Sequence, residues 1–280
     1  MRTSNAMQLK AMINKKAREL GVHPQRVMQN YLLERLLERV SASDYSDRII
    51  VKGGMLIGSL LGLERRTSMD LDTTVRGLEL TREKASEVFR GICAVRVDDD
   101  ITFEVTGCED IRETDDYPGL RVHLMARYGP MATPLKVDVT TGDRITPSAV
   151  AYDYPLLFDE RSIHIMSYPV ETVMAEKLET VLSRGIANTR LRDYYDIHML
   201  WLMRRDRIDL STLGEVLAAT VEKRGSAPAA SDFEDVMDAI RNDASMTARW
   251  NAYAKGNDYS KDLSFETVCA TTIEVLRALA

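Results

Sequence analysis

The sequence predicts an α+β fold, a mixed β-sheet flanked by helices with more helices before it and an α-helical domain after it. Three observations support this. Segments with helical periodicity occupy both ends of the chain, and alternating segments typical of strands lie between them. The 280 residues, 45% of them hydrophobic, can bury a full core. We therefore expect an N-terminal helical pair at 1–47, a sheet-containing core at 48–168 and an α-helical domain at 169–280.

The N-terminal segment predicts two helices. Gln8–Leu20 has helical periodicity and stops at Gly21, which can adopt the left-handed conformation that often ends a helix. Pro24 can begin a second helix that runs to Val40. Basic side chains gather at this end, where they could form part of an RNA-binding rim, although a solvated amphipathic face explains them more simply. They are Lys10, Lys15, Lys16, Arg18 and Arg26.

The chain after residue 48 predicts a strand, a tight turn and a short helix. Ile49–Val51 is apolar, as expected of a buried strand, and Gly53 and Gly54 can turn the chain at its end. Met55–Leu63 has the apolar repeat of a short helix. Backbone N–H groups at the start of such a helix can point at an anion, so the glycine turn suits phosphate.

A second strand, expected to begin at Met69, carries two carboxylates. Side chains alternate across a strand, so Asp70 and Asp72 would share one face and Leu71 would turn into the core. Two adjacent carboxylates repel each other, so we expect a cation between them. Mg²⁺ suits this position because it binds one or two carboxylates and completes its coordination with water and substrate phosphates.

The remainder of the core predicts one helix and three strands. Thr81 can cap a helix that ends near Ala94, and the acidic run Asp98–Asp100 is expected to be a solvent-exposed turn. Strand alternation then marks Thr102–Cys108, Leu120–Tyr128 and Leu135–Thr140. On the last of these strands Asp138 lies on the polar face, which can approach the Asp70/Asp72 pair. Three carboxylates around a metal ion fit phosphoryl-transfer chemistry.

The C-terminal part predicts helices throughout. Pro169 begins the most regular one, which Gly185 breaks. Lys177 on this helix has acids near it, so it is either a helix-surface ion pair or a ligand for a triphosphate, which an ammonium suits as a point charge. On the next helix, Asp193 and Asp196 lie three residues apart and therefore on one face. The predicted helices are Leu191–Leu202, Leu213–Glu222, Asp232–Ile240 and Phe265–Leu279.

In combination these features resemble the AbiEii/AbiGii toxin family of nucleotidyltransferases, within the DNA polymerase β-like nucleotidyltransferase superfamily. The resemblance covers roughly residues 49 to 200 and depends on four segments. They are Lys52-Gly53-Gly54, Arg66-x-Ser68-x-Asp70-Leu71-Asp72, Lys136-Val137-Asp138-Val139 and Glu171–Asp196. The resemblance implies a nucleotidyltransferase-like core whose active site the α-helical C-terminal domain completes.

The resemblance also implies a reaction and its residues. The protein would transfer a nucleoside monophosphate from an NTP to an acceptor, with tRNA as the expected acceptor, as the toxin of a type IV-like toxin–antitoxin or abortive-infection pair with a separate antitoxin. Asp70, Asp72 and Asp138 would bind Mg²⁺, and Asp138 or Asp196 would complete metal binding or activate the acceptor. The residues expected to hold or line the nucleotide are Gly53, Gly54, Arg66, Ser68 and Lys177.

Composition excludes several other classes. No run of about 18 apolar residues is present and the N-terminus lacks a secretory signal, so we expect a cytoplasmic protein with no membrane partner. Cys93, Cys108 and Cys269 have neither the number nor the spacing of a disulfide framework or zinc site. The net charge of −6 argues against a protein that coats DNA.

Two alternatives keep the fold but change the function. One is a transferase that modifies a small molecule or a protein side chain, which nothing in the sequence excludes. The other is a non-catalytic nucleotide-binding module. The clustered Asp70 and Asp72, together with Lys177, argue against the module, because a protein without catalysis has no need of clustered acids.

Overall fold

The computed structural model describes residues 5–111, 119–141, 145 and 148–279. The chain divides into two compact units. The N-terminal unit comprises Met1–Arg144 with Ala149–Tyr168, and the C-terminal unit comprises Ile145–Ser148 with Pro169–Ala280. Within the described ranges, no helix is both long enough and apolar enough to cross a membrane.

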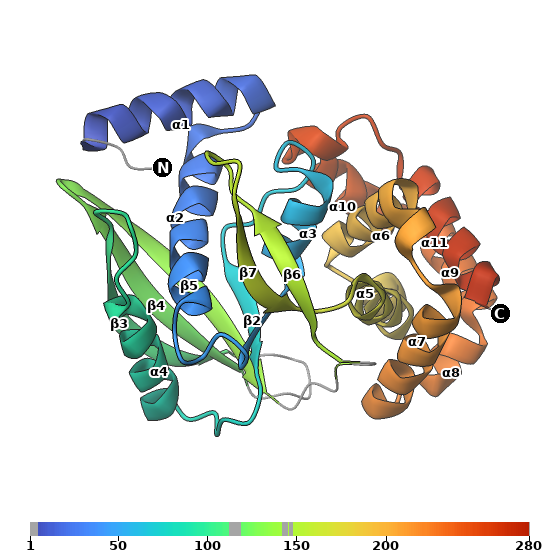
Figure 1. Cartoon of the computed structure of the whole chain (residues 1–280). Coiled ribbons are helices and arrows are strands. Elements are labelled where there is room, and N and C mark those ends of the chain that lie inside the picture. The colour runs from blue at the N-terminus through green and yellow to red at the C-terminus, as the bar shows by residue number, and fades with distance from the viewer. Residues whose placement is uncertain (1–4, 112–118, 142–144, 146–147, 280) are drawn as a thin grey trace. The chain divides into compact units, whose positions relative to one another are not determined.

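A seven-stranded mixed sheet forms the centre of the N-terminal unit in the described residues (Figure 1). Its order is β3-β4-β5-β2-β1-β7-β6. Strand β2 is parallel to β5 and β1 is parallel to β7, whereas the other neighbours are antiparallel. The strands are β1 (Ile49–Lys52), β2 (Leu71–Val75), β3 (Thr102–Ile111), β4 (Gly119–Tyr128), β5 (Met131–Thr141), β6 (Val150–Pro155) and β7 (Ser162–Ser167). The prediction of an α+β fold with a mixed sheet is confirmed.

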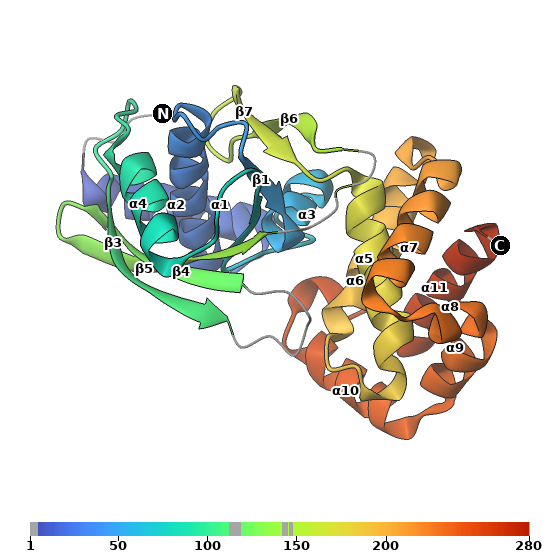
Figure 2. The ribbon, with the colours of Figure 1, turned by 90° about the horizontal axis from the view of Figure 1, so that it is seen from below.

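In the described part of this unit four helices accompany the sheet, and Figure 2 shows α2 and α4 on one of its faces. They are α1 (Ala6–Leu20), α2 (Pro24–Ser41), α3 (Gly53–Leu61) and α4 (Arg82–Ala94). Local signals set their ends, because Asn5 Oδ1 accepts the Gln8 N–H at 2.9 Å and Thr81 Oγ1 accepts the Lys84 N–H at 3.1 Å. Gly21 ends α1 in the left-handed conformation, as the sequence predicts.

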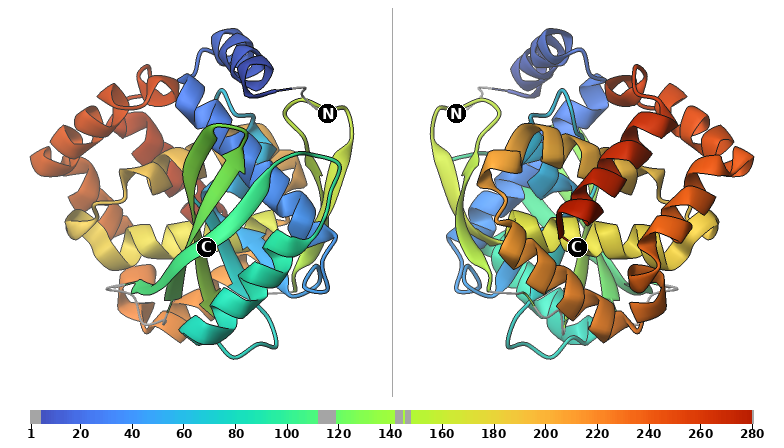
Figure 3. Two further views of the ribbon diagram at one scale, coloured as in Figure 1. Left: turned by 90° about the vertical axis from the view of Figure 1, so that its left-hand side faces the viewer. Right: turned by 90° about the vertical axis from the view of Figure 1, so that its right-hand side faces the viewer.

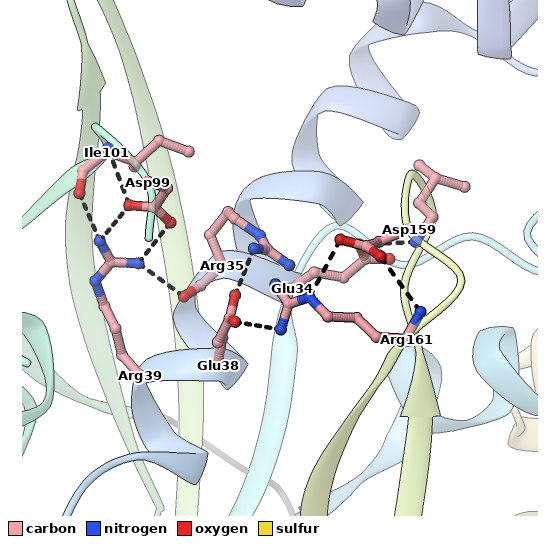
Figure 4. A network of polar contacts seen from close by, with 9 residues as sticks. Glu34, Arg35, Glu38, Arg39, Asp99, Ile101, Asp159 and Arg161 are labelled. Carbon is pink, nitrogen blue, oxygen red and sulfur yellow. Dashed lines mark hydrogen bonds and ion pairs between the residues drawn. The ribbon is translucent and has the colours of Figure 1, made fainter. Parts of the chain in front are cut away.

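Helix α2 carries a buried network of charged side chains (Figure 4). Arg39 binds both carboxylate oxygens of Asp99, at 3.0 and 2.7 Å, and also donates to the Ile101 carbonyl. The expectation that Asp98–Asp100 is solvent-exposed is wrong for Asp99, whose side chain is 4% exposed. The physical reason is tertiary, since the buried guanidinium of Arg39 needs a paired carboxylate and the loop supplies it.

Glu34, also on α2, is a buried carboxyl group whose hydrogen-bond donors are neutral. Its Oε1 accepts the Asn30 side-chain N–H at 2.7 Å, and its Oε2 accepts the Leu157 backbone N–H at 3.1 Å. Burial raises the pKa of Glu34 from its ordinary 4.5 to about 8, against the opposing effect of these hydrogen bonds and of Arg35. The folded state therefore binds a proton at Glu34 more tightly than the unfolded chain does.

This difference predicts how stability depends on pH. Between the ordinary pKa of 4.5 and the folded-state pKa of about 8, Glu34 makes the free energy of unfolding fall as pH rises, by up to about 1.4 kcal/mol per pH unit. We expect Glu34→Gln to remove this slope and to be more stable than wild type at pH 8. Urea unfolding from pH 5 to 8.5 measures the free energy of unfolding of both proteins. If it depends on pH in the same way for wild type and Glu34→Gln, the prediction is wrong.

The C-terminal unit is α-helical, and Figure 3 shows its helices from two sides. Its core includes Trp250, which is fully buried and donates its indole N–H to the Leu263 carbonyl at 2.9 Å. Helix α5 packs against α6 and α7, and α11 packs against α6. The helices are α5 (Val170–Arg184), α6 (Leu191–Arg204), α7 (Leu210–Arg224), α8 (Ala227–Ser231), α9 (Phe233–Asn242), α10 (Ala244–Lys255) and α11 (Phe265–Leu279).

Candidate active site

A row of four charged residues crosses neighbouring strands of the sheet. Lys52 on β1 lies opposite Asp72 on β2. Asp72 in turn lies beside Asp138 on β5, which faces Arg121 on β4. Side chains of residues that are directly paired leave the same face of a sheet. Two carboxylates therefore project side by side, with a cationic residue at each end of the row.

Asp70 stands just outside this row. Strand β2 begins at Leu71, so the prediction that it begins at Met69 and includes Asp70 is wrong. The preceding loop uses its backbone carbonyls for other bonds. Gln29 donates to the Met69 carbonyl at 2.9 Å, and Ser68 Oγ donates to the Asp70 carbonyl at 3.0 Å. Side-chain donors thus take the acceptors that a partner strand would otherwise use.

The carboxylates repel each other, and this repulsion contributes to a raised pKa of Asp70. Burial raises the pKa of Asp70 above its ordinary value, and the charges of Asp138 and Asp72 raise it further. Lys136 and Arg121 act in the opposite direction without cancelling the rise. The site therefore holds an excess of negative charge, which would favour a bound cation.

Arg121 holds Asp138 by both carboxylate oxygens. Its Nε and a terminal nitrogen lie 2.7 and 2.8 Å from the two oxygens, and the pair is partly exposed. This hydrogen-bonded pairing raises the pKa of Arg121 above its already high ordinary value. Arg121 was not predicted from the sequence, although the two-residue turn between Tyr128 and Met131 fixes a register in which Arg121 faces Asp138.

The pairing affects what the carboxylates can hold. In the part of the chain that the structure describes, no three or more His, Cys, Asp or Glu side chains are grouped as metal ligands. Both carboxylate oxygens of Asp138 accept hydrogen bonds from Arg121, so Asp138 is less available to a metal ion than an unpaired carboxylate would be. Asp70 and Asp72 fit a divalent cation by their oxygen donors and by the raised pKa of Asp70. Asp138 could join them only by sharing its carboxylate.

The glycine pair lies against Asp72. A Cβ atom at Gly53 would clash with Asp72 Oδ2, and Gly53 has a φ of 65°, so a side chain is excluded twice. The Gly54 N–H donates to the same oxygen at 3.1 Å. Both glycines belong to the first turn of α3, which begins at Gly53 and not, as predicted, at Met55. The start of this helix therefore orients the Asp72 carboxylate.

Arg66 and Ser68 are packed behind the glycines. A Cβ atom at Gly54 would lie 2.7 Å from Ser68 Oγ, and one at Gly58 would lie 2.7 Å from the Arg66 carbonyl oxygen. Arg66 is 2% and Ser68 8% exposed, and the Arg66 guanidinium donates to the Thr67 carbonyl. Both residues thus help to hold the loop that carries Asp70 against α3. The sequence analysis did not identify Gly58, whose four-residue spacing from Gly54 marks this close contact.

Lys52 ends β1 at the edge of the same polar face. Its ammonium donates to Thr140 Oγ1 at 2.8 Å and lies 5.4 Å from the centre of the Tyr168 ring. Thr74 joins Thr140 and Tyr168 through hydroxyl contacts of 2.9 Å each. The lysine is therefore held by a hydroxyl and aromatic network beside the carboxylates.

The C-terminal unit contains a second cluster of predicted residues. Lys177 on α5 lies 2.5 Å from Asp193 and 2.9 Å from Asp196, both on α6. Asp196 is fully buried, and the other two side chains are 15% and 12% exposed. Burial alone would lower the pKa of Lys177, but the two carboxylates outweigh it and raise that pKa. The interpretation as a helix-surface ion pair is wrong, because the partners come from another helix and the cluster is buried.

The chain is similar to known proteins in sequence and in fold. The family model described as nucleotidyl transferase AbiEii toxin, Type IV TA system, matches residues 35–271. A solved structure of a candidate nucleotidyltransferase from H. pylori is 13% identical, with a TM-score of 0.51, and the match covers 92% of this chain and 97% of that one. The structure of JHP933 from Helicobacter pylori is 14% identical, with a TM-score of 0.53, and covers 91% and 93%. These two likenesses show the fold. No curated protein matched the sequence.

Proposed function

The chain belongs to the AbiEii family of nucleotidyl transferase toxins of type IV toxin–antitoxin systems, and from that premise we propose that it transfers a nucleoside monophosphate from an NTP to tRNA in a Mg²⁺-dependent reaction. Family membership brings the nucleotidyltransferase activity, the NTP substrate and an antitoxin partner with it. The tRNA acceptor and the choice of Mg²⁺ are our proposals.

The observation that supports the reaction best is the pairing of Asp72 with Asp138 on neighbouring strands, with Asp70 close enough that both charges act on it. Burial and the charges of Asp138 and Asp72 both raise the pKa of Asp70, so a bound cation would relieve an unfavourable concentration of negative charge. Asp70 and Asp72 would hold the metal, with Asp138 as a third ligand. The bound ion would neutralise charge on the transferring phosphoryl group.

The remaining residues have proposed roles around the nucleotide. Gly53 and Gly54 let the Asp72 carboxylate lie against the start of α3, so a triphosphate bound to a cation at Asp72 would lie beside the positive end of this helix. Lys177 has three N–H donors, of which two reach Asp193 and Asp196, and the third can donate to a phosphate oxygen. We propose Asp196 as the residue that keeps this ammonium charged and oriented.

A labelling assay tests the proposed function. Purified protein is incubated with Mg²⁺, total tRNA and each of the four labelled NTPs. The control is Asp153→Asn, which removes a carboxylate that is 73% exposed on β6. We expect label on tRNA with wild type and with this control, and none without Mg²⁺.

Other outcomes separate the alternatives. If label appears only when a whole lysate replaces tRNA, and enters protein or small molecules, the acceptor proposal is wrong and the transferase stands. If the protein binds NTP but labels nothing in lysate either, the chain acts as a nucleotide-binding module and the proposed function fails.

A further inference from the structure

The Arg121–Asp138 pair occupies a position that the proposed function assigns to a metal ligand. Both oxygens of Asp138 accept hydrogen bonds from one guanidinium, which is the strongest geometry open to an ion pair at this site. The two side chains are only 29% and 19% exposed, so water screens the pair less than it screens a surface pair. A cation approaching Asp138 therefore meets a charge of its own sign.

The charges around this pair favour a cation elsewhere in the site. Asp70 is influenced by the negative charges of Asp138 and Asp72 and by the positive charges of Lys136 and Arg121. Arg121 in turn is influenced by Asp70 as well as by Asp138. The Arg121 guanidinium is thus paired with Asp138 on β5, while the charge of Asp70 also acts on it.

We infer that Arg121 is a positioning residue that competes with the divalent cation for Asp138 and, when Asp138 shares its carboxylate with that cation, binds a phosphate of the NTP. The inference rests on the proposed function. A planar guanidinium suits both roles, because its fork of N–H groups matches a carboxylate and a phosphate equally well. Arg121 would thereby link metal binding to substrate binding, since its two partners are bound in turn.

The competition predicts opposite changes in two affinities. Arg121→Gln removes the positive charge and frees Asp138, so we expect this variant to bind Mn²⁺ about tenfold more tightly than wild type does. Mn²⁺ binding is measured by the loss of the electron paramagnetic resonance signal of the free ion. The same variant loses a phosphate ligand, so we expect the Kd of a non-hydrolysable NTP analogue, measured by calorimetry, to rise about tenfold or more. Arg121→Lys, which keeps the charge but not the fork, should bind Mn²⁺ like wild type while the analogue binds more weakly.

Two controls separate this role from a structural one. Arg127→Gln removes an exposed arginine from the same strand, 3.6 Å from Glu104, and should change neither affinity. In an Asp138→Asn background, Arg121→Gln should no longer tighten Mn²⁺ binding, because residue 138 then has no carboxylate for which Arg121 and Mn²⁺ can compete. Thermal unfolding of each variant confirms that it is folded. If Arg121→Gln does not fold, Arg121→Lys carries the test, because a wild-type Kd for the NTP analogue in that variant would overturn the phosphate-binding role.

The binding measurements test the inference independently of catalytic activity. Mn²⁺ binding that is unchanged or weaker in folded Arg121→Gln would overturn it, and so would binding that Arg121→Gln tightens equally in the wild-type and the Asp138→Asn backgrounds. Absence of Mn²⁺ binding to wild type at millimolar concentration would overturn it as well. Failure to label tRNA would count against the proposed acceptor but would leave these binding results, and hence the inference, unaffected.

Discussion

Replacing Asp72 with asparagine is expected to lower the rate of nucleotidyl transfer by at least about 10³-fold while the protein stays folded. Asp72 is central to the charged row, between Lys52 and Asp138, and the Gly54 N–H fixes its carboxylate. Asparagine keeps the shape and can still accept that N–H, but it removes the charge that a metal ligand needs. The measurement is the initial rate of label transfer at saturating NTP.

The neighbouring variant Asp70→Asn separates a catalytic from a structural carboxylate. The pKa of Asp70 is raised in the folded state, so its ionisation makes stability fall as pH rises above its ordinary pKa of 3.8. Asp70→Asn should therefore be inactive yet at least as stable as wild type at pH 7. A folded Asp72→Asn enzyme with wild-type rate, or an Asp70→Asn protein that unfolds in less urea than wild type, would contradict this assignment.

Replacing Lys177 with methionine is expected to lower the free energy of unfolding by about 3–5 kcal/mol. Methionine fills much of the same volume but leaves Asp193 and Asp196 facing each other, and Asp196 is fully buried. Uncompensated charge in such a place has no water to stabilise it. Urea unfolding measures the change, and Lys84→Met, which removes an exposed lysine paired with Glu87 on α4, should leave the free energy of unfolding almost unchanged.

A triple variant then separates stability from function. Lys177→Met combined with Asp193→Asn and Asp196→Asn removes all three charges, and we expect it to recover most of the lost stability. If Lys177 also binds the triphosphate, as we propose, this stable variant will still be inactive. Full activity in the triple variant would show that the cluster only stabilises the C-terminal unit.

Several features of the protein could be predicted because they depend on residues close together in the chain. The helix beginning capped by Thr81, the end of α1 at Gly21 and the strand alternation around Asp138 each need only a few neighbouring residues. The order of glycines and aspartates was enough to point to the family that the comparisons show. Strands β6 and β7 were not predicted, although Ile163 and Ile165 of β7 alternate with polar residues, and their place in the sheet comes only from pairing with each other and with β1.

The charged partners of individual residues could not be predicted from the sequence. Asp99 looked like part of an exposed turn until Arg39, 60 residues away, was placed beside it. The sequence left Lys177 as either a surface ion pair or a phosphate ligand, and it gave no sign that Asp193 and Asp196 on α6 are its partners. Such pairs depend on how strands and helices pack, and a residue gives no local sign of which distant charge it will meet.

The sequence by itself determined which residues we propose for the chemistry, because Asp72 and Asp138 follow from strand alternation and Asp70 from the motif that it forms with Asp72. Only the tertiary structure decided how those charges are used. Parallel pairing of β2 with β5 sets Asp72 beside Asp138, and antiparallel pairing with β4 commits Asp138 to Arg121. The reason is physical, since a carboxylate's ability to bind a cation depends on the charges and the burial around it, and these come from segments far apart in the chain.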